Sequence, residues 1–163
     1  MDIVLARIDN RLIHGQVLES WVPTIQANCI IVANDEVAQS AMQRILMEAA
    51  VPKGIKVIVD TIDAVARMFR TDELGPVRAL LLFATANDAR RAIESGVPFK
   101  KLNLGNMHAG SGKMQCSCTI FLDPVDVIDL QNIEASGVSV TSQCIPSDRE
   151  MEWSKMLRKT VKG

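Results

Sequence analysis

Short apolar runs alternate with longer amphipathic segments along most of the chain. Several runs are continuously apolar, which is typical of strands buried on both faces of a parallel sheet. The expected strands are residues 3–8, 29–33, 56–59, 79–83, 101–104, 119–122 and 138–142. Their alternation with helices predicts an α/β fold of three layers. In it, an open, doubly wound, mainly parallel sheet of about six or seven strands is covered by helices on both faces.

The expected helices are marked by periodicity and by capping residues. Residues 37–49 place apolar side chains at three-to-four spacing, which predicts one amphipathic helix with an apolar face on the core. Thr61 is an expected N-cap, and Asp123 followed by Pro124 is another. Residues 147–150, Ser-Asp-Arg-Glu, match a capping box and predict the start of a C-terminal helix.

Composition narrows the class of protein. A chain of 163 residues with 48% apolar residues predicts one compact domain, residues 1–163. The net charge of −1 does not favour a nucleic-acid binder. No uncharged apolar run is long enough for a transmembrane helix, and Asp2 and Arg7 interrupt the N-terminal run where a signal peptide would be apolar. Four cysteines without C-x-x-C spacing and two histidines predict neither a metal site nor a cofactor, and they favour the cytoplasm.

The segment after the first expected strand contains several side chains that are suited to one kind of chemistry. Arg7, Asp9, Arg11 and His14 fall within eight positions, and the chain then enters an expected helix at residues 16–21. Ligands of open α/β sheets bind outside the carboxyl ends of the strands, and the free N–H groups of a helix start favour an anion. Arginine is suited to phosphoryl oxygens because it offers planar, charged, bidentate donors. These residues predict a phosphohistidine site.

His14 is the expected nucleophile, and its ring must be neutral to attack phosphorus. Arg11 is the first choice for the phosphate clamp because it lies closest to His14 in sequence. Arg7 is either a second phosphate ligand or a partner of Asp9. Asp9 orients a ring nitrogen, positions Arg11 or caps the turn, and the sequence leaves these roles open.

Further candidate phosphate ligands come from the turn itself and from other strand ends. Gly15 and Gln16 follow His14, and their backbone N–H groups open the expected helix. Thr85 follows the fourth expected strand, where it either donates its hydroxyl to phosphate or caps the next helix. Asn34 and Asp35 follow the second expected strand, where helix capping is the alternative role.

A glycine-rich loop at residues 105–112 supplies the remaining candidates. Glycine at this density gives the backbone freedom, and long loops in compact domains are often functional. His108 either assists proton transfer beside His14 or is an exposed loop residue. Ser111 and Lys113 are similar loop candidates.

The segment Arg7-Ile-Asp-Asn-Arg-Leu-Ile-His-Gly-Gln-Val17 resembles the active-site signature of one protein family. This family is the IIB component of the mannose/fructose/sorbose (and N-acetylgalactosamine) class of the bacterial phosphoenolpyruvate-dependent sugar phosphotransferase system. Three weaker stretches are similar in kind and order, so the resemblance runs through most of the chain. They are Val32-Ala-Asn-Asp-Glu36, Leu104-Gly-Asn-Met-His108, and Gly137-Val138 followed by Ile145-Pro146.

The resemblance implies a role in sugar uptake. In that family the histidine corresponding to His14 accepts a phosphoryl group from the phosphorylated IIA component and passes it to a sugar. The partners implied are the IIA protein or domain, the membrane IIC/IID permease and a small-molecule sugar, without nucleic acid. The implied location is the cytoplasm, with peripheral association to the permease. Members of the family often assemble as oligomers, so a homo-oligomer is compatible with the resemblance.

Two other functions compete with this interpretation. A histidine phosphatase or mutase also uses an Arg-His-Gly strand end, but here Ile13 precedes His14, and only His108 is available as a second histidine. A phosphate- or nucleotide-binding regulatory module of the same fold is the other alternative. The chain has neither a G-x-G-x-x-G sequence after the first expected strand nor a G-x-x-x-x-G-K-[ST] loop.

Overall fold

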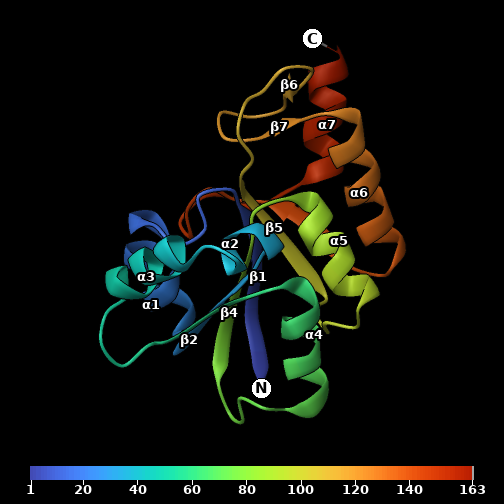
Figure 1. Cartoon of the computed structure of the whole chain (residues 1–163). Coiled ribbons are helices and arrows are strands. Elements are labelled where there is room, and N and C mark those ends of the chain that lie inside the picture. Colours follow the sequence, from blue (N-terminus) through green and yellow to red (C-terminus); the bar gives the residue numbers. More distant parts are fainter. Residues whose placement is uncertain (163) are drawn as a thin grey trace.

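The structure is a computed structural model in which residues 1–162 are described. A seven-stranded sheet with the order β3-β2-β4-β1-β5-β8-β9 forms its centre (Figure 1). Neighbouring strands pair in parallel except β8 and β9, which are antiparallel. The strands are β1 (Asp2–Asp9), β2 (Cys29–Ala33), β3 (Lys56–Asp60), β4 (Arg78–Phe83), β5 (Lys101–Asn106), β8 (Ser139–Ser142) and β9 (Met151–Glu152). The predicted α/β class and mainly parallel sheet are confirmed.

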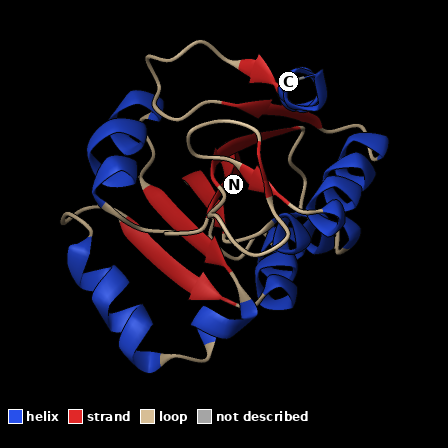
Figure 2. Ribbon diagram, turned by 90° about the horizontal axis from the view of Figure 1, so that it is seen from above, coloured by secondary structure: helices blue, strands red, loops and turns tan. Residues whose placement is uncertain are grey.

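Helices cover both faces of this sheet and complete the three predicted layers (Figures 1 and 2). One face carries the π-helical η1 (Val17–Trp21), α1 (Val22–Ile25), α2 (Asp35–Ala38) and α3 (Ala41–Ala50). The other carries α4 (Ile62–Thr71), α5 (Ala86–Glu94), α6 (Pro124–Ala135) and α7 (Trp153–Lys162). Each layer packs on its own apolar cluster. Leu80 and Leu81 of β4 point into opposite clusters, as the two-residue period of a strand requires.

Capping side chains explain where two of the helices begin. The Thr61 side chain accepts a hydrogen bond from the N–H of Ala64 and starts α4. Asp123 and Asp126 form a reciprocal capping box around the first turn of α6, with Pro124 at its first position. Both N-caps predicted from the sequence are confirmed.

The prediction of one continuous helix over residues 37–49 is wrong. The chain leaves helical geometry before Ser40, whose side chain accepts a hydrogen bond from the N–H of Gln43 and starts α3 as a new helix. The predicted burial is also wrong, because Met42, Ile45 and Leu46 of α3 are exposed. Periodicity shows that apolar residues share a helix face, but it does not show what covers that face.

The expected strand at residues 119–122 does not join the main sheet. Only β7 (Phe121–Leu122) forms there, and it pairs antiparallel with β6 (Met114–Gln115) in a separate two-stranded sheet. This small sheet lies beyond the carboxyl ends of the parallel strands, close to α6 and α7 (Figure 1). It occupies the connection from β5 to α6 that contains the glycine-rich loop.

The predicted capping box at residues 147–150 does not start a helix. The carboxylate of Asp148 instead accepts a hydrogen bond from the N–H of Ile145 and closes a local turn. The chain then forms β9, and α7 begins at Trp153, which is buried against the body of the protein. The same short polar side chains serve turns and helix caps, so the motif did not distinguish the two.

The strand order places β1 between β4 and β5, where the direction of the connections changes. The chain leaves β1 and β2 toward the face covered by η1, α1, α2 and α3, whereas it leaves β4 and β5 toward the opposite face. Connections that diverge in this way open a crevice at the carboxyl ends of the strands, where open α/β sheets bind their ligands. The loop that carries His14 follows β1 at this position.

Candidate active site

A tight turn after β1 presents His14 at the carboxyl edge of the sheet. The N–H of Leu12 donates to the carbonyl oxygen of Asp9 at 2.9 Å, and Leu12 adopts a φ of 57°. This left-handed conformation is uncommon for a residue with a side chain and has to be stabilised by its surroundings. Leu12 and Ile13 provide that stabilisation because both are buried in the apolar cluster beneath η1. The turn is therefore anchored at its strained residue and at the residue after it, and the His14 ring that follows is partly exposed.

Asp9, the last residue of β1, links the charged groups of the site. Its Oδ2 lies 3.0 Å from Nε2 of His14, and its Oδ1 accepts hydrogen bonds from the backbone N–H of Arg11 at 3.1 Å and from Arg11 Nε at 3.3 Å. Burial raises the pKa of the Asp9 carboxyl, but the hydrogen bond and charge of His14 and the hydrogen bonds from Arg11 outweigh burial, so the pKa lies below its ordinary value. Asp9 is a carboxylate at neutral pH. It therefore accepts a hydrogen bond from Nε2–H of His14, and Nδ1 is the ring nitrogen that Asp9 does not engage.

Arg11 forms the exposed side of this cluster. Its side chain is 46% exposed, and its guanidinium lies 3.3 Å from Oε1 of Gln16 as well as against Asp9. The backbone N–H groups of Gly15 and Gln16 begin the helical segment directly after His14. A half-exposed donor fork and free helix-start N–H groups beside one ring are suited to bind an anion. Asp9, Arg11 and His14 are referred to below as the His14 cluster.

Arg7, a candidate phosphate ligand in the sequence, is completely buried beneath this cluster. One guanidinium nitrogen donates to the side chain of Asn103 and, at 2.8 Å, to the carbonyl oxygen of Gln143. The other donates to the carbonyl oxygen of Cys144 at 2.9 Å, and the Trp21 ring lies 4.7 Å from the guanidinium carbon. Arg7 thus connects the ends of three parallel strands, β1, β5 and β8.

The surroundings of Arg7 correct its predicted role. Burial lowers the pKa of Arg7 to about 10, against the effect of Asp9, whose carboxylate lies 3.5 Å away, so the guanidinium remains charged at neutral pH. Gly105 lies so close that a Cβ atom there would overlap the guanidinium. Arg7 therefore has no surface to offer a phosphoryl group. The alternative role, pairing with Asp9, is the one that the structure shows.

Three candidates at other strand ends take part in the scaffold. Asn34 caps α2 and donates its amide to the buried carboxylate of Asp88 at 2.8 Å. Thr85 caps α5 by accepting a hydrogen bond from the N–H of Asp88. Asp35 pairs with Arg91 at 2.7 Å. Helix capping is the alternative role that the sequence left open for Asn34 and Thr85. Among the described residues, the hydrogen bonds of the His14 cluster do not include these side chains.

The candidates on the glycine-rich loop form no hydrogen bond or ion pair with the His14 cluster in the described part of the chain. His108 and Ser111 are exposed on the segment that leads to β6, and Lys113 pairs with Asp126 of α6 at 3.2 Å. Within residues 1–162, none of the three shares a hydrogen bond or ion pair with His14. A phosphatase or mutase mechanism that needs a second histidine gains no support from this arrangement.

Sequence reasoning missed the residues that surround Arg7, namely Trp21, Asn103, Gln143 and Cys144. One signal was available, because Asn103 is a polar residue within an apolar strand and stands in register with Arg7 on β1. Gln143 and Cys144 directly follow β8, so they also lie at the carboxyl edge of the sheet. Their carbonyl groups, and not their side chains, bind Arg7, and a sequence motif does not show such contacts.

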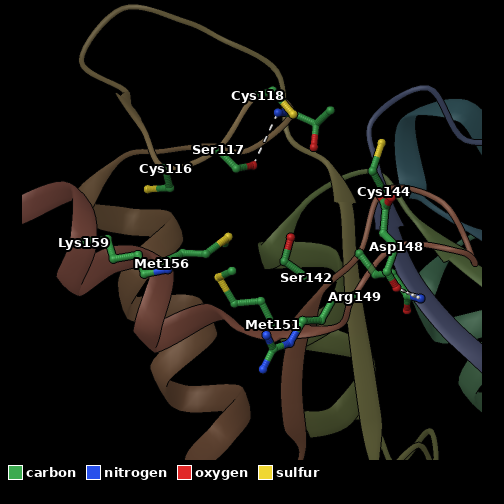
Figure 3. Close-up of a pocket in the computed structure, with 12 residues that line it drawn as sticks. Cys116, Ser117, Cys118, Ser142, Cys144, Asp148, Arg149, Met151, Met156 and Lys159 are labelled. Carbon is green, nitrogen blue, oxygen red and sulfur yellow. Dashed lines mark hydrogen bonds between the residues drawn. The ribbon is translucent and has the colours of Figure 1, made fainter.

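A hollow of about 420 Å³ lies on the C-terminal side of the sheet, and Cys144 forms part of its wall. Figure 3 shows Met151 and Met156 reaching into the space between Cys116 and Ser142. None of the His14 cluster lines this hollow. The nucleophile candidate therefore lies outside this hollow.

Residues 1–162 provide neither a metal site of clustered side chains nor a membrane-spanning helix. They contain no group of three or more His, Cys, Asp or Glu side chains arranged to hold a metal ion. In the same part of the chain, no helix has the length and apolar character needed to cross a bilayer.

Comparison with known proteins places the chain in a family. Residues 3–162 match the model of the PTS system sorbose subfamily IIB component. The fructose-specific EIIB component of Bacillus subtilis is 33% identical over 162 residues, 99% of each chain. The N-acetylgalactosamine-specific phosphotransferase enzyme IIB component 2 of Escherichia coli is 37% identical over 157 residues, 96% of this chain and 99% of that protein. The crystal structure of the IIBSor domain of the sorbose permease from Klebsiella pneumoniae superimposes with a TM-score of 0.93 at 31% identity, covering 98% of each chain. The chain therefore belongs to the sorbose subfamily of IIB components of the sugar phosphotransferase system.

Proposed function

We propose that this IIB component carries a phosphoryl group on His14. It accepts the group from a phosphorylated IIA protein or domain and transfers it to a sugar delivered by the membrane IIC/IID permease. The observation that carries the proposal is the 3.0 Å contact between Asp9 and Nε2 of a partly exposed His14, with Arg11 alongside. PTS IIB components are phosphotransferases that work with IIA and IIC/IID components, and the proposal assigns that chemistry to named atoms.

The acceptance step starts at Nδ1 of His14. Because ionised Asp9 holds the proton on Nε2, the lone pair of Nδ1 is available for attack on phosphorus. The Nδ1–P bond forms as the donor's N–P bond breaks, and the donor ring keeps that electron pair. The His14 ring gains positive charge, which the carboxylate of Asp9 stabilises through Nε2–H. The phosphoryl oxygens, with about two negative charges, meet the guanidinium of Arg11 and the N–H groups of Gly15 and Gln16.

The donation step uses the same groups in reverse. A phosphorylated ring that is protonated on Nε2 is an imidazolium, so its nitrogen is a good leaving group. A sugar hydroxyl oxygen attacks phosphorus, the N–P electron pair returns to Nδ1, and the hydroxyl proton is released to water. The overall reaction is that of a protein-Nπ-phosphohistidine–sugar phosphotransferase, in which Asp9 keeps His14 reactive in both directions. It requires the protein to associate with the permease at the cytoplasmic side.

Labelling by a phosphorylated IIA component of a sugar system of this class tests the proposal. Intact-mass spectrometry should show the gain of one phosphoryl group by the wild-type protein and no gain by His14→Ala. The His14→Ala variant should keep its fold, because the side chain lies at the surface edge of the sheet. Labelling that persists in His14→Ala would disprove the assignment. Circular dichroism confirms that a negative result is not due to unfolding.

A further inference from the structure

Helix α3 exposes an apolar face that the fold does not use. Met42, Ile45 and Leu46 are more than half exposed, and no residue of α3 is fully buried. Their three-to-four spacing places them on one side of the helix. Single exposed apolar residues are ordinary on protein surfaces, but a contiguous group of large ones is typical of a site that another molecule covers. We call these three residues the α3 patch.

The α3 patch is continuous with the surface that carries His14. A hollow of about 220 Å³ is lined by Ile13, Gln43, Leu46 and Met47. Ile13 directly precedes the phosphoryl acceptor, and Leu46 belongs to the patch. Apolar side chains therefore extend from the turn of His14 onto α3. Helix α3 lies on the same side of the sheet as α1 (Figure 1).

A second exposed apolar site has no such relation to His14. Val125 and Ile128 of α6 are exposed beside a hollow that includes Met114 and Leu122. Helix α6 packs on the opposite face of the sheet from α3, and Figure 1 shows the two helices on opposite sides of the molecule. Exposed apolar character alone thus does not single out α3, whereas its continuity with the turn of His14 does.

We propose that the α3 patch is the docking surface for the protein that donates the phosphoryl group. This proposal rests on the proposed function, in which the donor's histidine sits on a folded protein. Transfer between the donor's histidine and His14 requires the protein surface around the donor's ring to contact the surface beside His14. The patch offers an apolar centre, and exposed Gln43, Arg44 and Glu48 supply a polar rim of the kind found in reversible interfaces. The matching donor surface is an apolar side chain next to the phosphohistidine, shaped for the hollow between Ile13 and Leu46.

The other possible occupants fit the structure less well. A stable second copy of this chain on α3 would occupy the hollow that Ile13 shares with Leu46 and would compete with any partner that docks there. The sugar is a small molecule and by itself presents no protein surface to the flank of the His14 loop. A donor histidine brings flanking protein surface with it, and that surface has to lie against a flank of the loop. The α3 patch is an apolar flank of this kind.

The test compares two variants matched in residue type, element and exposure. Ile45→Glu introduces a charge into the α3 patch at a position 61% exposed, and Ile128→Glu introduces the same charge on α6 at a position 54% exposed. With a phosphorylated IIA component as the donor, Ile45→Glu should raise the KM for that donor by about tenfold or more. The single-turnover rate at saturating donor should stay within about twofold of wild type, because the His14 cluster is unchanged. Ile128→Glu should match the wild type in both quantities, and Ile45→Ser serves as a second variant if the charge perturbs folding.

A small phosphodonor separates docking from chemistry. Phosphoramidate needs no docking surface, so it should label the wild type, Ile45→Glu and Ile128→Glu equally. If neither phosphoramidate nor phosphorylated IIA labels the wild type, the proposed function fails, and the docking proposal fails with it. If wild-type labelling is normal and Ile45→Glu keeps the wild-type KM for IIA, only the docking proposal is overturned.

Two further outcomes would assign the α3 patch to another occupant and overturn the proposal. In the first, Ile45→Glu accepts phosphate from IIA normally but loses sugar phosphorylation with permease-containing vesicles. In the second, the wild type sediments as a dimer that Ile45→Glu dissociates. Chemical-shift mapping with unphosphorylated IIA provides independent support if the perturbed amides lie on α3 and at Ile13, and not on α6.

Discussion

Replacing Gly105 with alanine should destabilise the whole site, although the change adds a single methyl group. The new Cβ would overlap the Arg7 guanidinium, which is completely buried and held by the Asn103 side chain and by the carbonyl groups of Gln143 and Cys144. Gly105 has no positive φ, so the effect arises from this overlap and not from backbone strain.

The size of the effect follows from what the guanidinium would lose. Overpacking a rigid interior costs about 1–3 kcal/mol. A buried charge that loses its partners costs about 3–5 kcal/mol. We expect Gly105→Ala to lower the free energy of unfolding by about 3–5 kcal/mol, because Arg7 cannot move without leaving its acceptors. For a chain of this length, that loss corresponds to a Tm lower by roughly 10 °C.

Urea unfolding followed by tryptophan fluorescence would measure this loss, and Gly110→Ala is the matched control. A Cβ at Gly110 would meet only the Lys113 side chain, at ordinary contact distances of 3.6 Å and more. Gly110→Ala should therefore leave the free energy of unfolding within about 1 kcal/mol of wild type. In an Arg7→Leu background, the additional effect of Gly105→Ala should shrink, because the overlapping group is absent. Equal stabilities of Gly105→Ala and Gly110→Ala would refute the reasoning.

Three further predictions concern the chemistry of the His14 cluster. Arg11→Lys keeps the charge but loses the planar fork, so stopped-flow labelling by phosphorylated IIA should be slower by about one to two orders of magnitude. A wild-type rate in Arg11→Lys would indicate that backbone N–H groups, and not the Arg11 guanidinium, hold the phosphoryl oxygens. The pKa of Asp9 is lower in the folded state than its unfolded value of about 4. The ionised carboxylate therefore stabilises the fold fully above about pH 4, and this stabilisation is lost as the pH falls through the folded-state pKa. Urea unfolding between neutral and acidic pH should show a shallower loss of stability below about pH 4 for Asp9→Asn than for wild type, and parallel curves would contradict the Asp9 assignment. The phosphoryl label should be acid-labile, alkali-stable and formed in the presence of a chelator. An acid-stable label, or one that forms directly from ATP, would exclude phosphohistidine.

The local part of the site could be predicted because it is encoded within one turn. Asp9, Arg11 and His14 are neighbours in sequence, so any compact turn after β1 brings them together. The fold class was predictable for a similar reason, since apolar runs such as residues 29–33 and 79–83 are too uniformly apolar for an exposed strand.

The role of Arg7 could not be predicted, because it is decided by distant residues. Arg7 and Arg11 look equivalent in the sequence, four positions apart on either side of Asp9. Their environments differ because β5 and β8 pair beside β1 and bring Asn103 and Cys144 over Arg7, whereas Arg11 lies beyond the end of the strand. Each contact spans more than ninety positions of the chain. Only strand pairing, which no local pattern specifies, determines which arginine is buried.

Two residues depart from local rules, and both departures bear on the proposed function. Arg7, whose charge favours the surface, is buried beneath the turn of His14, and Ile45, whose spacing favours the core, is exposed on α3. A fold selected only for stability would reverse both choices, since burying a charge is costly and exposing Ile45 forgoes its burial. Sequences depart from local consistency mainly where function requires it. Arg7 pairs with the Asp9 carboxylate, which lies against the His14 ring. In the docking proposal, Ile45 stays uncovered until a donor protein binds. Both exceptions are therefore explained by one requirement, a rigid acceptor on a surface that another protein can cover.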